Sequence, residues 1–238
     1  MSTSEALERY RPTLSDRAAE FRARLAGRLE LGLHTTTIRY GLSRDLTLPL
    51  TMPKAKIPIT VRPLQPQDLD LLFSVEAANN DPVEAREAAM RRSFFAHGAH
   101  RAFVAVDERS GRPCYVQWLL GVRDNAFIST LKGFPLLQPG EALLENAYTP
   151  AAFRGLGIMS VAMALIAERA ADLNARHVFT YVGDDNIPSL KGCQRAGFHP
   201  VLLHHCDRLA FGLLRTDRFE LDVSVTGSFG NGSAKQLT

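Results

Sequence analysis

One stretch of the chain combines the residue types that bind an anion. Residues 148–160 read YTPAAFRGLGIMS and place Gly155 and Gly157 just ahead of a long apolar segment. Glycines at this spacing let successive backbone N–H groups turn toward one point, because no Cβ atoms obstruct them. A helix that begins here would add the positive end of its dipole at the same point. The pattern therefore predicts a cradle for a phosphate or pyrophosphate group.

A single acid lies upstream of this cradle, inside an apolar segment. Glu145 belongs to 143–148, LLENAY, which is predicted to be a short buried strand. Its apolar neighbours are expected to desolvate the carboxylate and raise its pKa toward neutrality. A carboxylate with such a pKa is suited to act as a general base. The alternative is a structural acid that pairs with an arginine or with a backbone N–H group.

Three other motif interpretations fail on spacing. The dinucleotide-binding fingerprint needs a third glycine where Ser160 stands, within repeated βαβ units that this chain lacks. The Walker A motif needs Lys followed by Ser or Thr after Gly157, and neither follows. The run 204–206, HHC, lies in a predicted strand, where adjacent side chains point to opposite faces, and it has no spaced partner motif. We therefore expect no metal site.

The composition limits the class of protein. A chain of 238 residues is long enough for one domain with an extension, and a net charge of +3 suits anionic ligands without the dense Lys/Arg stripe of a nucleic-acid binder. Cys114, Cys193 and Cys206 show no paired spacing, which indicates reduced thiols. The polar N-terminus is not typical of a secretory signal, and no apolar run approaches the roughly 18–20 residues that span a bilayer. We expect a cytoplasmic protein without a membrane span that does not bind nucleic acid.

Hydrophobic periodicity and turn residues predict the elements that position these groups. Helices are predicted at 15–31, 66–73, 83–97, 158–173 and 187–196, and strands at 59–64, 102–106, 114–120, 143–148, 178–182, 198–205, 209–214 and 218–225. The connection 122–141 is long for a hairpin and is expected to carry substrate contacts, although 126–131 fits an extra strand equally well. Prolines within 46–58 indicate an extended tether.

These elements divide the chain into three parts. Residues 1–56 are expected to form a helical N-terminal extension with a Pro-rich tether, and residues 57–225 an α/β domain. Residues 226–238, rich in Gly and Ser, are expected to be a disordered tail.

Two motifs in the correct order resemble those of the GNAT superfamily of acyl-CoA-dependent acyltransferases. The run RGLG at 154–157 follows a predicted strand, NIPS at 186–189 comes about thirty residues later, and AGF at 196–198 closes the second motif. The resemblance covers about residues 57–225. It implies an α/β (α+β) fold in which a mixed, largely antiparallel sheet is flanked by helices. It also implies acetyl-CoA or another acyl-CoA as co-substrate.

The resemblance also implies a role for each residue of the two motifs. The backbone of 154–160 would hold the CoA pyrophosphate, and the strand edge at 147–149 would pair with the pantetheine arm. Asn186 would hydrogen-bond the co-substrate near its thioester end, although its position equally suits a helix N-cap. The cofactor-binding residues are thus expected to be Ala147, Tyr148, Thr149, Arg154, Gly155, Leu156, Gly157, Ile158, Met159, Ser160, Asn186 and Ser189.

Two positions depart from the family pattern. Met159 stands where the loop usually has its last Gly or Ala, so the first turn of the helix is bulkier. Cys193 stands where many members have a tyrosine that protonates the leaving thiolate, and it is either a replacement donor or a small core residue. Tyr181 or solvent are the other candidate donors. Tyr181 also lies with Asp184 and Asp185 near the expected entrance of the acceptor.

The resulting prediction is direct transfer of an acyl group, most simply acetyl, from CoA to an amine or hydroxyl. Glu145 would be the base, and Cys193 and Tyr181 the candidate acids. The acceptor is expected to be a small molecule or a sugar building block. Two alternatives stay open: transfer from an acyl-carrier-protein thioester, for which the basic extension would supply docking charge, and a non-catalytic acyl-CoA-binding regulatory module. A homodimer is compatible with the family.

Overall fold

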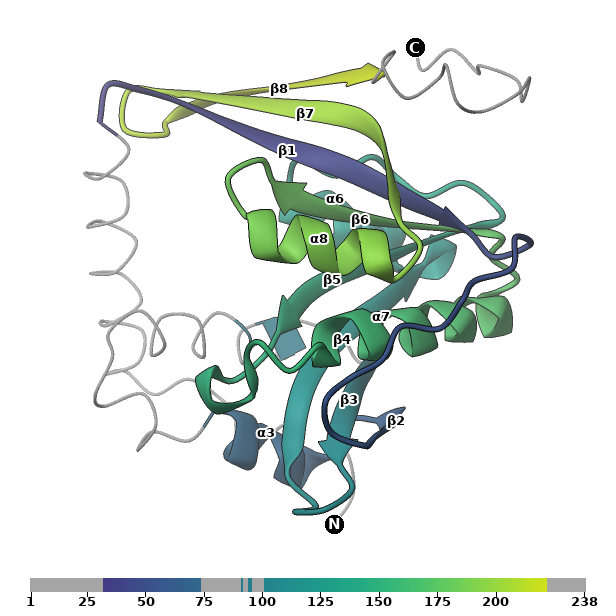
Figure 1. The fold of residues 1–238 in the computed structure, drawn as a ribbon. Coiled ribbons are helices and arrows are strands. Elements are labelled where there is room, and N and C mark those ends of the chain that lie inside the picture. Colours follow the sequence, from purple (N-terminus) through teal and green to yellow (C-terminus); the bar gives the residue numbers. More distant parts are fainter. Residues whose placement is uncertain (1–31, 74–90, 92–93, 96–100, 222–238) are drawn as a thin grey trace.

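The computed structural model describes residues 32–73, 91, 94–95 and 101–221. The described strands are β1 His34–Asp45, β2 Ile59–Pro63, β3 Ala102–Asp107, β4 Pro113–Gly121, β5 Glu141–Tyr148, β6 His177–Gly183, β7 His199–Leu209 and β8 Leu214–Leu221. They form one sheet in the order β2-β3-β4-β5-β6-β1-β7-β8, in which only the β5–β6 pair is parallel (Figure 1). The predicted mixed, largely antiparallel sheet is confirmed.

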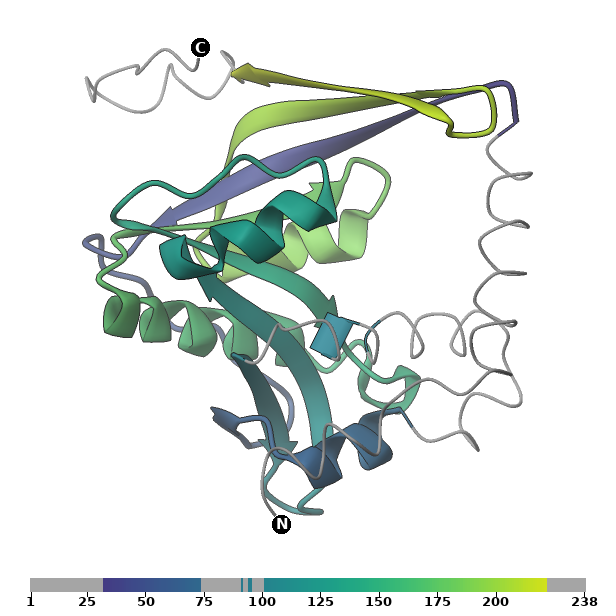
Figure 2. The same ribbon diagram turned by 180° about the vertical axis from the view of Figure 1, so that it is seen from behind.

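Helices cover both faces of this sheet. The described helices are α3 Pro66–Leu72, α6 Asn125–Leu131, α7 Ile158–Glu168 and α8 Ile187–Arg195, with short 3-10 turns η1 Val122–Asp124, η2 Ala151–Phe153 and η3 Arg169–Leu173. The helices α7 and α8 lie on one face, and α3 and α6 lie on the other (Figures 1 and 2). The predicted arrangement of a sheet flanked by helices is therefore confirmed for the described residues.

Successive side chains of the central strands point to opposite faces of the sheet, which explains why two hydrophobic cores form. On β4, Tyr115 and Leu119 pack on the α7 and α8 side, whereas Trp118 and Leu120 pack on the α3 and α6 side. Every residue of β4 is buried. A strand with both faces covered is expected to be nearly continuously apolar, as this one is.

The strand β1 was not predicted. Residues 34–45, which the sequence assigns to a helical extension, lie between β6 and β7 in the sheet. Arg39 pairs with Gly183 on one side and with His204 on the other. The sheet therefore begins before residue 57, where the sequence placed the domain boundary. The helix expected at 15–31, most of that at 83–97 and the tail at 226–238 lie outside the described residues.

Two further local details differ from the sequence-based predictions: an alternative left open at 126–131, and a strand predicted at 209–214. Residues 126–131 belong to α6 and not to an extra strand, and Ile128 from this helix is buried in the core beneath it. Residues 209–214 were predicted as a strand, but β7 continues through Leu209 and a turn follows. Ala210, Phe211 and Gly212 all have positive φ, which a strand does not allow. The final strand starts at Leu214.

The central parallel pair opens toward one end. Pairing of β5 with β6 is confined to Glu141–Leu143 and His177–Phe179, and the strands then diverge (Figure 1). Asn146 interrupts β5 with a φ of 59°, and the β4–β5 register shifts between Val116 and Trp118. This irregularity has the character of a β-bulge, which re-aims side chains. Beyond it, Tyr148 packs into the core under α3 and α6, while its neighbour Ala147 packs against the α7 core.

Candidate functional site

A cavity of about 690 Å³ lies where β5 leaves β6, next to the N-terminal ends of α7 and α8. Every residue that the sequence predicted for cofactor binding lines it. These residues are Ala147, Tyr148, Thr149, Arg154, Gly155, Leu156, Gly157, Ile158, Met159, Ser160, Asn186 and Ser189. We call this space the first cavity. Its walls come from 147–160, from α8 with the preceding Asn186, and from the segment before β2, together with Arg91 and Tyr115.

The glycine loop has the geometry of an anion cradle. Gly155 and Gly157 have φ values of 75° and 76°, a conformation that side chains with a Cβ atom rarely adopt. Gly157 is the N-cap of α7 and has no side-chain cap hydrogen bond. The first N–H groups of a helix have no partner within the helix, so these donors and the helix dipole are directed toward the cavity. The loop can therefore hold a phosphate group through its backbone.

The bulk of Met159 is accommodated by the neighbouring helix. A Cβ atom at Gly192 of α8 would lie 3.0 Å from the Met159 Sδ atom, so the thioether packs over this glycine. The residue still lines the first cavity. The larger side chain at position 159 is thus matched by the absence of a side chain at position 192.

A segment that precedes β2 forms part of the first cavity, although no motif identified it. The Lys56 N–H donates to the Leu156 carbonyl at 2.8 Å, and a Cβ atom at Gly157 would lie 3.0 Å from the Lys54 carbonyl oxygen. The side chains of Lys54 and Lys56 line the cavity. The expected tether therefore packs directly on the glycine loop and adds positive charge beside it.

Two arginines also border the first cavity. The Arg195 Nε atom donates to the Ser160 Oγ atom at 3.2 Å, which places a guanidinium near the start of α7. The Arg91 Nη2 atom donates to the Ala147 carbonyl at 3.1 Å, and its guanidinium lies 4.5 Å from the centroid of the Tyr148 ring. The carbonyl of Ala147 at the strand edge is therefore already engaged.

Asn186 has the N-cap role that the sequence allowed. Its Oδ1 atom accepts a hydrogen bond from the Ser189 N–H at 3.2 Å at the start of α8. Within the described part of the chain, no partner of its Nδ2 atom is found. The side chain can therefore cap the helix and donate a hydrogen bond into the cavity at the same time.

Glu145 faces a second cavity of about 590 Å³, which lies on the α6 side of the sheet. The described residues that line it are Thr36, Thr37, Ile38, Arg39, Leu131, Lys132, Phe134, Glu145, Gly183, Asp184, Asp185, His204, Cys206, Arg208 and Arg215. Burial raises the pKa of Glu145 to about 7, and the nearby charge of Arg39 opposes this shift only in part. The predicted raised pKa is therefore supported by its surroundings.

The two cavities adjoin the same strand. Glu145 lines the second cavity, and Ala147 and Tyr148 line the first. Asn146 stands between them at the irregularity of β5, and its Nδ2 atom is buried without a hydrogen-bond partner among the described residues. A single short stretch of β5 thus separates Glu145 from the glycine loop.

The candidate proton donors occupy different positions. Cys193 is fully buried against α7, where its Sγ atom lies 3.7 Å from Met163 Sδ, and burial raises its pKa to about 12. It lines neither cavity. The ring of Tyr181 lies below the Arg39 guanidinium, 5.5 Å from it, and burial raises its pKa. Asp184 and Asp185 are exposed at the rim of the second cavity.

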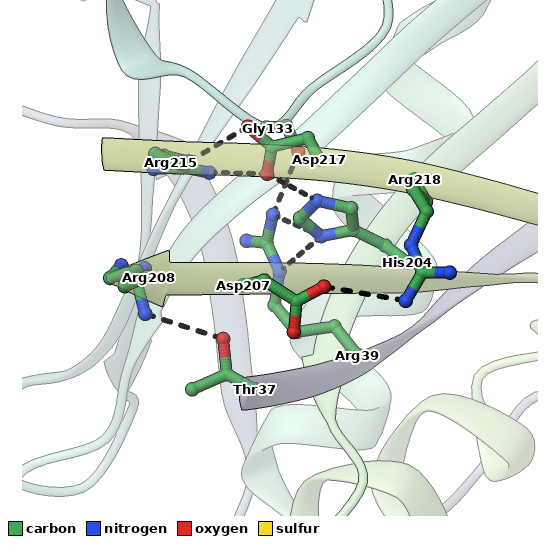
Figure 3. A network of polar contacts seen from close by, with 9 residues as sticks. All are labelled: Thr37, Arg39, Gly133, His204, Asp207, Arg208, Arg215, Asp217 and Arg218. Carbon is green, nitrogen blue, oxygen red and sulfur yellow. Dashed lines mark hydrogen bonds and ion pairs between the residues drawn. The ribbon is translucent and has the colours of Figure 1, made fainter. Parts of the chain in front are cut away.

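A polar network forms the wall of the second cavity opposite β5 (Figure 3). Arg39 donates to His204 Nδ1 from Nε at 3.1 Å, and the His204 Nε2 atom lies 2.7 Å from Asp217 Oδ1. Arg215 holds Asp217 through two hydrogen bonds of 2.7 and 2.8 Å, and these bonds lower the pKa of Asp217 to about 2. No signal of local sequence spacing identified this network, because its members come from three strands that pair only in the fold.

The described residues contain no group of three or more His, Cys, Asp or Glu that could hold a metal ion. Among the helices of the described residues, none is long and apolar enough to cross a membrane.

Solved structures with a similar fold include several acetyltransferases. The GCN5-related glucosamine N-acetyltransferase region of a fungal multi-domain GH3 β-N-acetylglucosaminidase has 14% identity and a TM-score of 0.52, over 82% of this chain and 23% of that chain. A Drosophila protein has 11% identity and a TM-score of 0.50, and the match covers 77% of this chain and 55% of that chain. A GNAT-family acetyltransferase from Colwellia psychrerythraea has 16% identity and a TM-score of 0.47, and the match covers 79% of this chain and 57% of that chain. This chain thus spans little more than half the length of the last two proteins.

Comparison at the level of sequence gives the family. No match was found among curated proteins. A family model described as Acetyltransferase (GNAT) domain matches residues 59–199, which is more than half of the chain and includes both motifs and Glu145. The chain belongs to the GNAT family of acetyltransferases.

Proposed function

We propose that this protein transfers an acyl group, most simply acetyl, from CoA directly to an amine or hydroxyl of a small-molecule or sugar-type acceptor. The observation that carries the proposal is the placement of Glu145 and the anion cradle in two cavities on either side of one stretch of β5. Family membership supports acyl-CoA as the donor. The second cavity, which contains the base, is the proposed acceptor site.

The first cavity is proposed to bind the CoA thioester. The pyrophosphate would lie on the N–H groups of 154–160, with Lys54 and Lys56 close to its charge. The pantetheine arm would run along β5 beside 147–149, in the gap that opens where pairing with β6 stops. Asn186 would donate its free amide hydrogen near the thioester end. This path directs the reactive carbonyl toward Asn146 and Glu145.

Glu145 is proposed to act as the general base. A protonated amine is not nucleophilic, so one proton must leave before the nitrogen attacks the thioester carbonyl. A carboxylate with a pKa of about 7 is ionised in a useful fraction at neutral pH and can accept that proton. The carbon–sulfur bond then breaks and CoA leaves as a thiolate. Glu145 therefore has to be deprotonated for turnover.

The proton for the leaving thiolate is proposed to come from Tyr181 or from solvent. Tyr181 has a raised pKa, which keeps its phenol protonated, and it lies beside Arg39. Neither Tyr181 nor Cys193 lines either cavity. Cys193 is less suited, because its thiol packs against Met163 in the core, whereas Tyr181 lies beside Arg39, which lines the second cavity. A donor at this step is not obligatory, since a CoA thiolate is a tolerable leaving group.

We also propose that the protein acts in the cytoplasm, where free thiols persist. Cys114, Cys193 and Cys206 are buried and unpaired, which supports this compartment. Homodimer formation stays a prediction.

A thermal-shift titration with CoA, acetyl-CoA and longer acyl-CoAs tests the proposed donor, and release of free thiol across a panel of amines and alcohols tests transfer. We expect the melting temperature to rise with acetyl-CoA and thiol to be released with at least one acceptor. No stabilisation by any CoA species would overturn the proposal. Stabilisation without turnover would favour a regulatory module, and stabilisation only by an acyl-carrier protein would favour that donor.

A further inference from the structure

The wall of the second cavity opposite β5 is one face of a three-stranded ribbon made by β1, β7 and β8. Register places Arg39 opposite His204, and His204 opposite Phe219. Two residues further along β7, Cys206 pairs with Asp217. Alternate residues of a strand share a face, so these side chains all project to the same side. Figure 3 shows this face, with Arg39, His204, Asp217 and Arg215 joined by hydrogen bonds.

Arg39 is a partly buried cation whose hydrogen-bond partners are neutral, and the nearby acid Glu145 attracts its charge without forming an ion pair among the described residues. Besides His204, its Nη2 atom donates to the Gly133 carbonyl at 2.7 Å, and its guanidinium lies 4.8 Å from the centroid of the Phe134 ring. Within the described residues, no carboxylate oxygen lies within 4 Å of its nitrogens. Burial lowers its pKa, which is the expected response of a charge removed from water. A buried charge is normally paired, so Arg39 has capacity for an anionic partner.

The neighbouring acid does not supply that partner. Asp217 is held by two hydrogen bonds from Arg215 and by one contact with His204 Nε2. Since His204 Nδ1 accepts from Arg39, the histidine is the neutral tautomer with its proton on Nε2. It therefore orients the guanidinium without neutralising it. The charge of Asp217 is offset by Arg215, and Arg39, which is attracted by Glu145 but makes no ion pair among the described residues, can bind an anionic ligand.

A second cation lies further along the same face. Arg208 lines the second cavity and donates to the Thr37 hydroxyl at 3.3 Å. In the described part of the chain it forms no ion pair. Of the acids that line this cavity, Asp184 and Asp185 are exposed at the rim, and Glu145 projects from β5. The cavity therefore has a base on one wall and unpaired guanidinium groups on the opposite wall.

We propose that the second cavity takes an acceptor that carries an oxyanion, either a carboxylate or a phosphate, in addition to its reacting amine or hydroxyl. Arg39 binds the oxyanion with help from Arg208, and His204 is a positioning residue for Arg39. This holds the reacting group toward Glu145. The substrate class is thus a small amino acid or an amino-alcohol phosphate, and a neutral amine is a poor substrate. The inference rests on the proposed function in taking this cavity as the acceptor site.

Direct binding tests this without requiring turnover. Two matched pairs serve as probes: 4-aminobutyrate against 4-aminobutanamide for a carboxylate, and phosphoethanolamine against ethanolamine for a phosphate. Titration calorimetry in the presence of saturating CoA is expected to show at least a 10-fold lower Kd for the charged member of one pair. Which pair shows the preference identifies the oxyanion. Equal binding within both pairs, or no binding of any member, would overturn the proposal.

Variants separate recognition from folding. Arg39→Met is expected to raise the Kd of the charged probe about 10-fold or more and to leave the neutral probe unchanged. Arg208→Met is expected to act in the same direction but less, and it provides the test if Arg39→Met fails to fold by circular dichroism. The control is Arg218→Met, because Arg218 contacts Asp207 at 3.3 Å on an exposed part of β8 and does not line the cavity. Equal loss for charged and neutral probes in both Arg39→Met and Arg208→Met would contradict a role in anion binding.

Failure of this inference is distinct from failure of the proposed function. If charged probes bind through Arg39 but no acceptor releases thiol from acetyl-CoA, the anion site holds and the transfer reaction is wrong. If neutral amines are acetylated as fast as charged ones, transfer holds and the anion site is wrong.

Discussion

The two cavities beside β5 are built in opposite ways. The first includes the glycine loop and the start of α7, 154–160, whose backbone N–H groups are directed toward it, and it is also lined by residues 147–149, by α8 and by Lys54 and Lys56. The second is lined by residues of β1, β5, β7 and β8, by Leu131, Lys132 and Phe134, and by 183–185. A backbone cradle depends on chain geometry and suits a ligand that a whole family shares. A side-chain wall can change residue by residue, so it suits an acceptor that is particular to one protein.

The largest effect is expected from removing the carboxylate of Glu145, the proposed base, which lines the second cavity. Glu145→Gln keeps the shape of the side chain but cannot accept a proton, so turnover should fall about 100-fold to 10,000-fold. The Kd of acetyl-CoA should change less than about 2-fold, because Glu145 does not line the first cavity. Steady-state kinetics and calorimetry measure the two quantities. Unchanged turnover would reject the base assignment.

The pH dependence sharpens this prediction. Because the pKa of Glu145 is raised to about 7, kcat/KM of the native protein should rise with pH and level off above about pH 8. A flat profile between pH 6 and 8 would contradict the assignment of the titrating group to Glu145.

Blocking the cradle should weaken donor binding alone. Gly157→Val places a branched side chain at a φ of 76°, with its Cβ atom 3.0 Å from the Lys54 carbonyl oxygen. The Kd of CoA should rise about 10-fold or more, because the loop and the 54–56 segment must move apart. The matched control is Gly111→Val, which has a φ of 68° and nothing within 4 Å of its Cβ. Equal weakening in both variants would attribute the effect to general instability.

The raised pKa of Glu145 should reduce stability at high pH. The pKa of Glu145 is raised on folding, so the folded state binds more protons than the unfolded state between about pH 4.5 and 7. Stability contributed by this residue therefore falls with rising pH across that window. Glu145→Gln should be more stable than the native protein at pH 8, by about 1 kcal/mol or more, and the difference should shrink near pH 5. Urea unfolding at both pH values measures it, and a constant difference would contradict the raised pKa.

A smaller effect, on the free energy of unfolding, is expected at Met159, where the loop departs from the family pattern. Met159 packs over Gly192, so Met159→Ala should cost about 1–2 kcal/mol of unfolding free energy through lost contact. The Kd of CoA should change less than about 3-fold, since backbone groups form the cradle. Thermal unfolding and CoA titration measure the two quantities. A large gain in CoA affinity would indicate instead that Met159 obstructs the phosphate.

The same contrast explains what the sequence could predict. The cradle was predicted residue by residue because 148–160 is a continuous strand–loop–helix segment whose glycines have a local reason to be there. Glu145 was identified by its apolar neighbours in a single strand. Both predictions depend only on residues that are close together in the sequence, so they can be made from the sequence alone.

The second cavity could not be predicted from the sequence, because the contacts that form it join residues far apart in the chain. Arg39 meets Gly183 and His204, which are far from it in the chain, and its strand was assigned to a helical extension. Lys54 and Lys56 were assigned to a tether, since their contact with the glycine loop depends on the fold. Cys193 was a candidate donor from its place in a motif, and only burial against Met163 shows how poorly it is placed for that role.

Hydrogen–deuterium exchange with and without acetyl-CoA tests the division between the cavities most directly, because it requires no acceptor. We predict slower exchange in peptides that cover 154–160, 54–56 and 186–189, which surround the first cavity. Peptides that cover 36–39, 204–208 and 214–218 should keep their exchange rates. Protection of the second set by acetyl-CoA, or no protection of the first set, would contradict the account.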